Sequence, residues 1–380
     1  MNTTQKHILF LPRWYPNKFD AMWGLFIKKH AESVALLNWV SILYLHAVDK
    51  GQKNIEFIEE KEEHLYTLYI YYPKPKNPIR YLLLFLQLYL KGIKLIQKRK
   101  KIDLIHVHIL SRMGILAWIT SYYKGLPYVI TEHWSRYLAT VNTYQGTLRQ
   151  WLTKKVIKKA KAVMPVTKNL KEAMIAHQLI NVNYQIVPNV VDDLFFNAPI
   201  KNNSAKRVIH VSTFENKSKN ISGIIEAIKV ITEHRKDFEM IFIGDGEDFE
   251  AMKSLAEEYQ LMEYIRFTGL MEKEALVDEY VTASFMIINS HYENMPVVIN
   301  EAMACGIPVL STNVGGINEH LDSSKGVLIE ANNPNQLIEQ FHWMLDHSSE
   351  FNKGDIRKYA EQRFSSKAIS RSLNNIYHSF

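Results

Sequence analysis

Short apolar runs alternate with amphipathic stretches along almost the whole chain. In the first half, strand-like runs such as HILFL, WVSILYL, DLIHVH, PYVITEH, AVMPV and YQIVPN are separated by segments with helical spacing. The second half restarts the rhythm with RVIHVS, FEMIFIG, YIRFTG, SFMIINS, IPVLST and KGVLIE. Strands that alternate with helices favour a largely parallel sheet covered on both faces. The pattern therefore predicts an α/β protein made of two doubly wound, Rossmann-like domains.

A break in this pattern separates the two halves. Between residues 192 and 206 the sequence DDLFFNAPIKNNSAK loses its periodicity and gathers Asn, Pro and Ser, which is typical of a linker. We therefore predict one domain at residues 1–197 and a second at residues 198–362. Two such domains in tandem are expected to face each other across a cleft, with the carboxyl ends of both sheets toward a ligand.

The composition is that of an ordinary globular enzyme, with 47% hydrophobic and 22% charged residues. The net charge of +7 conceals an asymmetry, because residues 1–200 carry +15 and the remainder carries −8. A basic N-terminal half predicts contact with something anionic, either a membrane surface or an acidic ligand. Nucleic acid is not expected as a partner, since no recognised binding motif accompanies the charge.

The cysteine content and the N-terminus limit the class of protein further. The first residues contain no long apolar stretch before a small-residue cleavage site, so we expect a cytoplasmic protein. Cys305 is the single cysteine, which excludes an internal disulfide and any multi-cysteine metal site. The sequence has neither zinc-ligand spacing nor an aspartate, any residue, aspartate triplet. We therefore expect chemistry that needs no metal and no cofactor.

The most hydrophobic stretch, residues 77–101, ends in a basic cluster. Its uncharged run, Tyr81 to Leu90, is well short of the roughly 20 apolar residues that span a bilayer. Two interpretations stay open. The stretch is either an amphipathic helix that rests on anionic lipid, peripherally at the inner face of the plasma membrane, or a domain helix with a solvated basic end.

The most specific segment is NSHYENMPVVINEAMACGIPVLSTNVGGINEH, residues 289–320. Glu293 follows a predicted strand at its C-terminal end, where side chains of a doubly wound sheet point into the crevice. Glu301 lies about two helical turns further on. A helix that begins near Pro296 would aim its unpaired N–H groups and its positive end at an anion in that crevice.

This segment resembles the signature of glycosyltransferase family 4, whose members are retaining enzymes with the two-domain GT-B fold. The glutamate pair, EAMACGIPV and VGGINE match as they stand, and the resemblance covers nearly the whole chain. It implies a hexosyltransferase that moves a sugar from a UDP- or GDP-sugar to a glycan or lipid-linked acceptor, in bacterial surface-polysaccharide or lipopolysaccharide synthesis. It also implies a C-terminal helix, residues 363–380, that crosses back to the N-terminal domain.

The resemblance assigns the nucleotide to the second domain. It implies that Glu301 bonds the ribose hydroxyls, that Lys219 binds the diphosphate, and that Gly244, in the loop FIGDGEDF, lies near the nucleobase. This loop is not a dinucleotide fingerprint, because the third glycine of that pattern falls on Phe249.

The donor sugar has its own set of implied contacts. Glu293 faces the sugar, and His133, in VITEHW, matches the family's histidine beside it. Asn189, in VPNVVD, is interpreted as a structural turn residue. The sugar hydroxyls are oriented by the backbone of Asn294, Met295, Pro296 and Val297.

Two further donor positions, Gly24 and Thr213, have more than one interpretation. Gly24 resembles the family's glycine loop under the donor phosphates, and the alternative is a helix-start glycine without a ligand. At Thr213 the family carries an arginine that clamps the diphosphate together with the lysine. Three explanations stay open: Lys217 or Arg13 supplies the charge, the donor is held differently, or activity is reduced.

Two other functions fit the same residues. A nucleotide-sugar 2-epimerase on this fold would convert its donor without an acceptor, although the run around Glu301 argues against it. A non-catalytic homologue would bind nucleotide sugar only, and the missing arginine is its best support.

Overall fold

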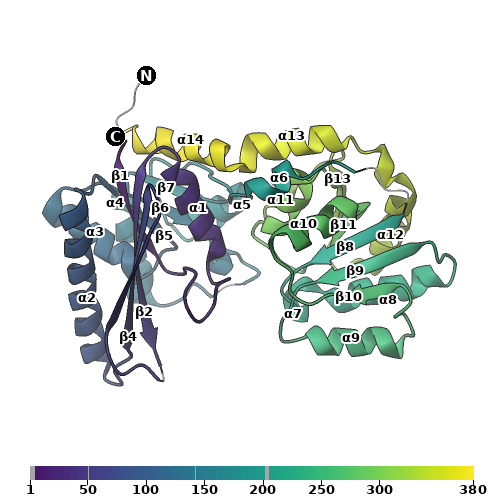
Figure 1. Cartoon of the computed structure of the whole chain (residues 1–380), viewed down its shortest axis with the longest axis horizontal. Helices are drawn as coiled ribbons and strands as arrows, with labels where there is room; N and C mark the ends of the chain where they lie inside the picture. The colour runs from purple at the N-terminus through teal and green to yellow at the C-terminus, as the bar shows by residue number, and fades with distance from the viewer. Residues whose placement is uncertain (1–4, 50, 142, 202–204) are drawn as a thin grey trace. The chain divides into compact units, whose positions relative to one another are not determined.

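The computed structural model describes residues 5–49, 51–141, 143–201 and 205–380, which form two compact units (Figure 1). Unit 1 comprises Met1–Val166, Lys171–Val190 and Ser366–Phe380, and unit 2 comprises Thr167–Leu170 and Val191–Ser365. The main boundary between the units thus lies between Val190 and Val191, whereas the sequence predicted it between residues 197 and 198. The chain re-enters unit 1 between Ser365 and Ser366, whereas the sequence predicted this boundary between residues 362 and 363.

Unit 1 is built around a seven-stranded sheet with the order β3-β4-β2-β1-β5-β6-β7. Neighbouring strands are parallel except β3 and β4, which are antiparallel. The strands are β1 (His7–Pro12), β2 (Trp39–Val48), β3 (Glu56–Lys61), β4 (Leu65–Pro73), β5 (Leu104–His108), β6 (Tyr128–Glu132) and β7 (Ala162–Pro165). The strand order reverses between β1 and β5, and in open parallel sheets the loops diverge at this point and leave a crevice for a ligand.

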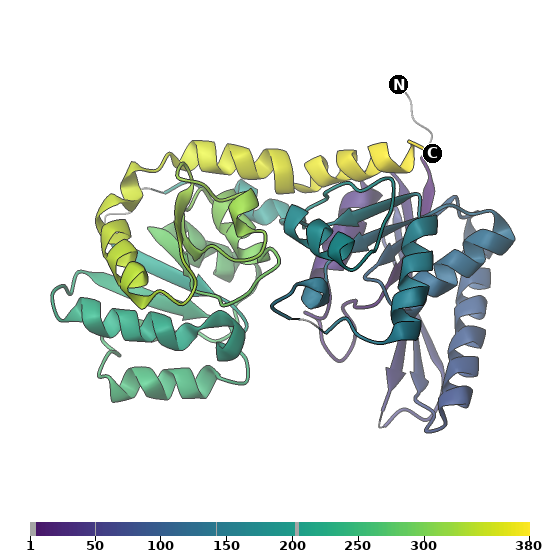
Figure 2. The same ribbon diagram turned by 180° about the vertical axis from the view of Figure 1, so that it is seen from behind.

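The helices of unit 1 cover both faces of this sheet (Figures 1 and 2). Asn77 begins the longest one, because its side chain accepts hydrogen bonds from the N–H groups of Ile79 and Arg80. The helices are α1 (Leu25–Ala35), α2 (Pro78–Arg99), α3 (Arg112–Lys124), α4 (Thr147–Lys159), α5 (Lys168–Ala176), α14 (Ser366–Tyr377) and a 3-10 turn at Ser135–Tyr137. Within the described ranges no helix is long and apolar enough to cross a bilayer.

The last helix completes the core of unit 1. Leu373 and Tyr377 of α14 are fully buried in the same apolar cluster as Ile8 of β1 and Ile27 of α1. The Tyr377 hydroxyl lies 2.7 Å from Nδ1 of His106, and α14 packs along α1. The end of the chain is therefore part of the first unit's interior.

Unit 2 contains a six-stranded, wholly parallel sheet with the order β10-β9-β8-β11-β12-β13. Its strands are β8 (Lys206–Val211), β9 (Phe238–Ile243), β10 (Ile265–Phe267), β11 (Phe285–Ile288), β12 (Val309–Thr312) and β13 (Gly326–Ile329). Successive residues Val208 and Ile209 belong to different buried clusters, so both faces of the sheet are covered. The strand order reverses between β8 and β11, and the prediction of two doubly wound units is confirmed.

The helices of unit 2 connect these strands. They are α6 (Asp193–Asn197), α7 (Asn216–Lys219), α8 (Ile221–Thr232), α9 (Phe249–Glu258), α10 (Lys273–Thr282), α11 (Val297–Ala304), α12 (Pro334–His347) and α13 (Lys353–Phe364), with 3-10 turns at Ile317–Glu319 and Ser348–Glu350. The predicted linker thus contains a short helix, α6, whose cap is the side chain of Asp192.

One local prediction fails and one strand pair was missed, each for a physical reason. The segment YQIVPN is not a strand: it follows β7 with only one isolated bridge, Tyr184 to Val163, and Pro188 cannot donate to a ladder. The antiparallel pair β3 and β4 was not predicted. β3 is an edge strand with three exposed charged residues. Such charges protect the edge of a sheet from pairing with another strand, but they interrupt the alternation of apolar and polar residues by which a strand is recognised in a sequence.

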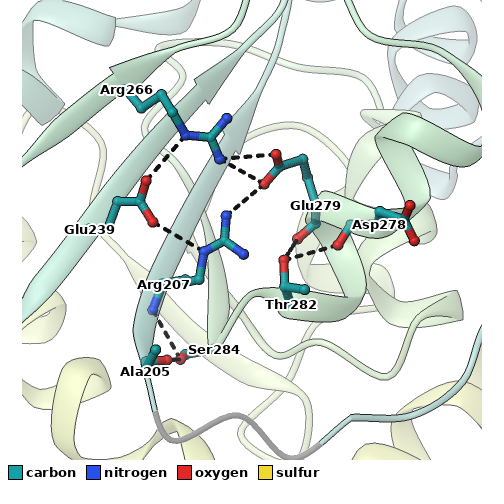
Figure 3. A network of polar contacts seen from close by, with 8 residues as sticks. All are labelled: Ala205, Arg207, Glu239, Arg266, Asp278, Glu279, Thr282 and Ser284. Carbon is teal, nitrogen blue, oxygen red and sulfur yellow. Dashed lines mark hydrogen bonds and ion pairs between the residues drawn. The ribbon is translucent and has the colours of Figure 1, made fainter.

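Four charged side chains join the amino ends of β8, β9 and β10 to helix α10 (Figure 3). Arg207 of β8 donates to Glu239 at 3.2 Å and to Glu279 at 3.0 Å. Arg266 of β10 donates to the same two carboxylates at 3.1 and 2.9 Å. Each guanidinium therefore bridges β9 and α10 at the edge of the sheet opposite the loops that follow β8 and β11.

We expect loss of this network to lower the stability of the protein and to leave ligand binding unchanged. Glu279→Ala should leave both guanidiniums with one shared partner, and we expect the free energy of unfolding to fall by about 1–3 kcal/mol in urea denaturation. Asp278→Ala, an exposed acid on the same helix, is the control and should stay within about 0.5 kcal/mol of wild type. Equal losses in both variants would contradict the structural role given to the network.

Candidate active site

The loops after β8 and β11 meet where the strand order of unit 2 reverses. Lys219 ends α7 after β8, and Glu293 lies between β11 and α11. The Lys219 Nζ atom lies 2.5 Å from Oε1 of Glu293, and the Ser290 hydroxyl donates to the same oxygen at 2.9 Å. The Lys219 and Glu293 side chains are only 19% and 11% exposed. The residues that the family resemblance assigns to the diphosphate and to the donor sugar thus form one ion pair.

The loop that carries Glu293 is held by the VGG run of the same segment. Gly316 donates its N–H to the carbonyl of Asn294 at 2.7 Å, and the Asn294 side chain accepts from Thr167 at 2.8 Å. Gly315 has φ +60°, and a Cβ there would lie 1.9 Å from the carbonyl oxygen of Glu293. Sequence reasoning matched these glycines without giving them a role, which is to let two loops pack closely.

Helix α11 points its amino end toward this loop. It begins at Val297, after the extended Pro296, and its first turn holds no acidic residue. Among the described residues no side chain caps it. Its first N–H groups and the positive end of its dipole are therefore suited to an anion or to hydroxyl oxygens beside Glu293.

Glu301 lies on α11, close to Tyr280, whose hydroxyl donates to Oε2 at 3.1 Å. Burial raises the pKa of Glu301 to about 7, against the opposing effect of the Tyr280 hydrogen bond, and the negative charge of Asp192 acts in the same direction as burial. At neutral pH this carboxyl group is therefore partly protonated. In its ionised form it accepts two hydrogen bonds, as a pair of neighbouring hydroxyls requires.

The loop after β9 packs against the loop after β8. Gly244 has φ +132°, and a Cβ there would lie 1.9 Å from the carbonyl oxygen of Ser212, next to the exposed Thr213. A Cβ at Gly246 would lie 2.6 Å from the nitrogen of Phe214. Close backbone packing thus explains both glycines of FIGDGEDF. Lys217 is exposed on α7, in the helix that ends at Lys219.

His133 belongs to unit 1 and follows β6. Its Nδ1 atom lies 3.0 Å from the side-chain oxygen of Asn189, and its Nε2 atom lies 3.3 Å from Nδ1 of His108. Burial lowers the pKa of His133 well below its usual value, and the neighbouring His30 lowers it further, so the ring is neutral at pH 7. Asn189 was interpreted only as a turn residue, yet its amide fixes the orientation of this ring.

The backbone conformation and packing at residue 24 require a glycine. Its φ is +72°, and a Cβ there would lie 2.6 Å from the carbonyl carbon of Trp14. The residue precedes α1 as its N-cap, and no described side chain caps that helix. Both interpretations of Gly24, a phosphate loop and a helix start, are compatible with this geometry.

Within the part of the chain that the structure describes, no group of three or more His, Cys, Asp or Glu residues is placed to hold a metal ion. Cys305, the single cysteine, is buried, and burial raises the pKa of its thiol to about 12.

Comparison with known proteins identifies both halves of the chain. The model of glycosyl transferases group 1 matches residues 191–363, and that of Glycosyltransferase Family 4 matches residues 51–193. The N-acetyl-alpha-D-glucosaminyl L-malate synthase of Bacillus anthracis is 26% identical over 74% of this chain and 76% of its own. A putative teichuronic acid biosynthesis glycosyltransferase of Bacillus subtilis is 26% identical over 62% and 60%.

The fold has counterparts among solved structures. An Anabaena protein crystallised in complex with UDP and glucose aligns with a TM-score of 0.72 and 16% identity, over 99% of this chain and 100% of its own. The two family models together extend from residue 51 to residue 363, one centred on each half. The chain is thus a glycosyltransferase, a member of family 4 with the GT-B fold.

Proposed function

We propose that this enzyme transfers a hexose, with retention of configuration, from a UDP- or GDP-sugar to a glycan or lipid-linked acceptor in cell-surface polysaccharide synthesis. The observation that carries the proposal is the Lys219–Glu293 ion pair at the strand-order reversal of unit 2. A relative and a structural neighbour support the substrate classes: the relative is named for teichuronic acid biosynthesis, and the neighbour was solved with UDP and glucose.

In this proposal the donor diphosphate binds Lys219, which then exchanges part of its contact with Glu293 for phosphate oxygens. Glu293 keeps the hydrogen bond from Ser290 and accepts from a hydroxyl of the donor sugar. Ionised Glu301 accepts from the ribose. The backbone of Asn294, Met295, Pro296 and Val297 orients the sugar, Gly244 and Thr213 border the nucleotide, Gly24 approaches the phosphates, and neutral His133 bonds a sugar hydroxyl.

The reaction breaks the bond between the anomeric carbon and the diphosphate oxygen. Negative charge then develops on the leaving diphosphate, and the Lys219 ammonium and the amino end of α11 stabilise it without a metal ion. The oxocarbenium-like sugar is attacked on the same face by the acceptor hydroxyl, whose proton leaves with the departing group. Retention follows from attack on the face that the diphosphate vacates.

We also propose that α2 rests on an anionic membrane, which brings a lipid-linked acceptor within reach of unit 1. Ile79, Leu82, Leu83 and Leu90 recur at helical spacing and are 68%, 50%, 55% and 62% exposed. They are not among the buried residues of α2, and the exposed side of the helix continues into basic residues toward the helix end. An apolar stripe beside a basic one is the pattern of helices that bind anionic lipid surfaces.

The first prediction concerns the diphosphate contact. Lys219→Ala should reduce the transfer rate about 100- to 1000-fold, as does removal of a donor that stabilises developing charge. Wild type should be stabilised in thermal shift by one class among UDP, GDP, ADP, CMP and their sugars, and Lys219→Ala should lose that shift. Lys358→Ala, an exposed lysine on α13, is the control.

Lys217→Ala and Arg13→Ala extend this experiment, since loss of the nucleotide thermal shift in either would identify the cation that replaces the family's arginine. Transfer that survives a chelator, with product of the donor's anomeric configuration, is expected. If no nucleotide stabilises wild type, the donor assignment is wrong.

The second prediction concerns pH. Because ribose hydroxyls bind the ionised form of Glu301, the Kd for the UDP- or GDP-sugar should rise as pH falls below about 7, approaching tenfold per pH unit. The sugar diphosphate itself does not titrate between pH 6 and 8, and Tyr280 stays neutral because burial holds its pKa well above the usual value. Calorimetry on Glu301→Gln should give weak binding without this slope. An equal slope in the variant would assign the effect to another group.

The third prediction concerns the membrane. The double variant Leu82→Glu, Leu83→Glu should bind vesicles of phosphatidylcholine with phosphatidylglycerol at least about tenfold more weakly than wild type, since each leucine contributes about 1.5–3 kcal/mol when buried. Leu270→Glu, at an exposed apolar residue of unit 2, is the control. Cosedimentation that is the same for both variants, or the same for neutral vesicles, would refute the lipid contact.

A further inference from the structure

We infer that a pocket within unit 1 binds the acceptor through an anionic group, a phosphate or carboxylate beside a sugar ring, held by Arg13 and Arg112. The inference deepens the proposed function and rests on it for the role of the bound molecule. It names the chemistry of the acceptor, which the family and the donor site leave open.

The pocket lies where the strand order of unit 1 reverses, at the carboxyl ends of the strands. It has a volume of about 350 Å³, and its walls include Arg13 after β1, Arg112 after β5 and Lys74 after β4. Cavities of this size hold a monosaccharide-sized ligand. All of its walls belong to unit 1, so the pocket is formed by this unit alone.

The charged side chains that line the pocket are all positive. Within the described chain no aspartate or glutamate lines it, while three cations do. Lys74 pairs with Asp49 at 2.8 Å, but no ion pair between described residues involves Arg13 or Arg112. Sites for neutral sugars usually need acceptor groups for the hydroxyl protons, whereas donors without carboxylates suit an anion.

The Arg13 guanidinium is placed at a cost that an anion would relieve. Partial burial lowers the pKa of Arg13, and the positive charges of Arg136 and Arg112 lower it further, against the opposing charge of Glu132. Arg112 is the first residue of α3, whose first turn holds no acid, so it faces the positive end of that helix. Like charges held together in this way mark a site built for a negative ligand.

Aromatic rings hold the guanidiniums and provide a surface for a sugar. Arg13 lies over Trp134 at 4.5 Å and Arg112 over Tyr81 at 4.8 Å from the ring centroids. Stacking on the rings occupies the flat faces of the guanidiniums and leaves the N–H groups at their edges available. These N–H groups can donate two parallel hydrogen bonds to a phosphate or carboxylate. Trp23, 46% exposed at the pocket, offers a ring face to the C–H side of a sugar.

The anion has two sources: an acidic sugar of the glycan, or the phosphate that joins a sugar to a lipid carrier. Tyr81, in the pocket wall, belongs to α2, the helix with the exposed apolar stripe. The experiment therefore uses soluble probes in one arm and lipid probes in the other.

The soluble arm compares methyl glucuronide with methyl glucoside, which differ only in the carboxylate, by calorimetry on the full chain. We expect the glucuronide to bind at least about tenfold more tightly than the glucoside. Arg112→Ala or Arg13→Gln should raise the Kd for the glucuronide at least about tenfold, because each variant loses a charge-assisted bidentate contact. Arg112→Lys should recover part of it. Arg371→Ala, at an exposed arginine of α14, is the matched control and should behave as wild type.

The lipid arm compares phosphatidylcholine vesicles that contain undecaprenyl phosphate with vesicles that contain phosphatidylglycerol. Binding of the former that depends on Arg112 assigns the anion to the lipid carrier, and binding of the glucuronide alone assigns it to the glycan. If the glucuronide binds no more tightly than the glucoside and vesicle binding in the lipid arm does not depend on Arg112, the inference is wrong. Thermal shift with nucleotides on the same sample separates this failure from failure of the proposed function, since only the latter removes nucleotide binding by wild type.

Discussion

The parallel sheet with both faces covered is the constraint on which the rest of this structure depends. Because helices occupy the faces, side chains from distant parts of the chain can converge around a ligand only at the edge where parallel strands end. The strand order reverses between β1 and β5 and again between β8 and β11, and there the loops part. Lys219 and Glu293 meet at one reversal, and Arg13 and Arg112 line the other.

The two edges of the sheet in unit 2 serve different purposes. At the amino edge, Arg207 and Arg266 are matched by Glu239 and Glu279, so the charges there are satisfied within the protein. At the carboxyl edge, one lysine and one glutamate form a single pair beside the amino end of a helix. A pair of this kind keeps a nearly buried carboxylate neutralised, and the same ammonium is available to a phosphate of higher charge.

The sequence was a good guide to the fold and to the residues that carry distinctive motifs. Alternating apolar runs defined the two units, and the segment around Glu293 and Glu301 indicated the family before any geometry was known. Contacts between distant positions were beyond it: nothing in the chain links Asn189 to His133, or Tyr280 to Glu301. The pocket of unit 1 was missed for the same reason, since its arginines lie in two separate loops without a motif. Only the excess basic charge of that half hinted at it.

The position of α14 has a consequence for how the protein is made. The interior of unit 1 includes Leu373 and Tyr377, although nearly all the rest of that unit precedes Val191. On the ribosome, unit 2 is complete while unit 1 still lacks a wall of its core, so the first unit translated is the last to be finished. Its exposed apolar surface must wait for the whole of unit 2 to emerge, and a truncation of the final helix would damage the half of the protein farthest from it in sequence.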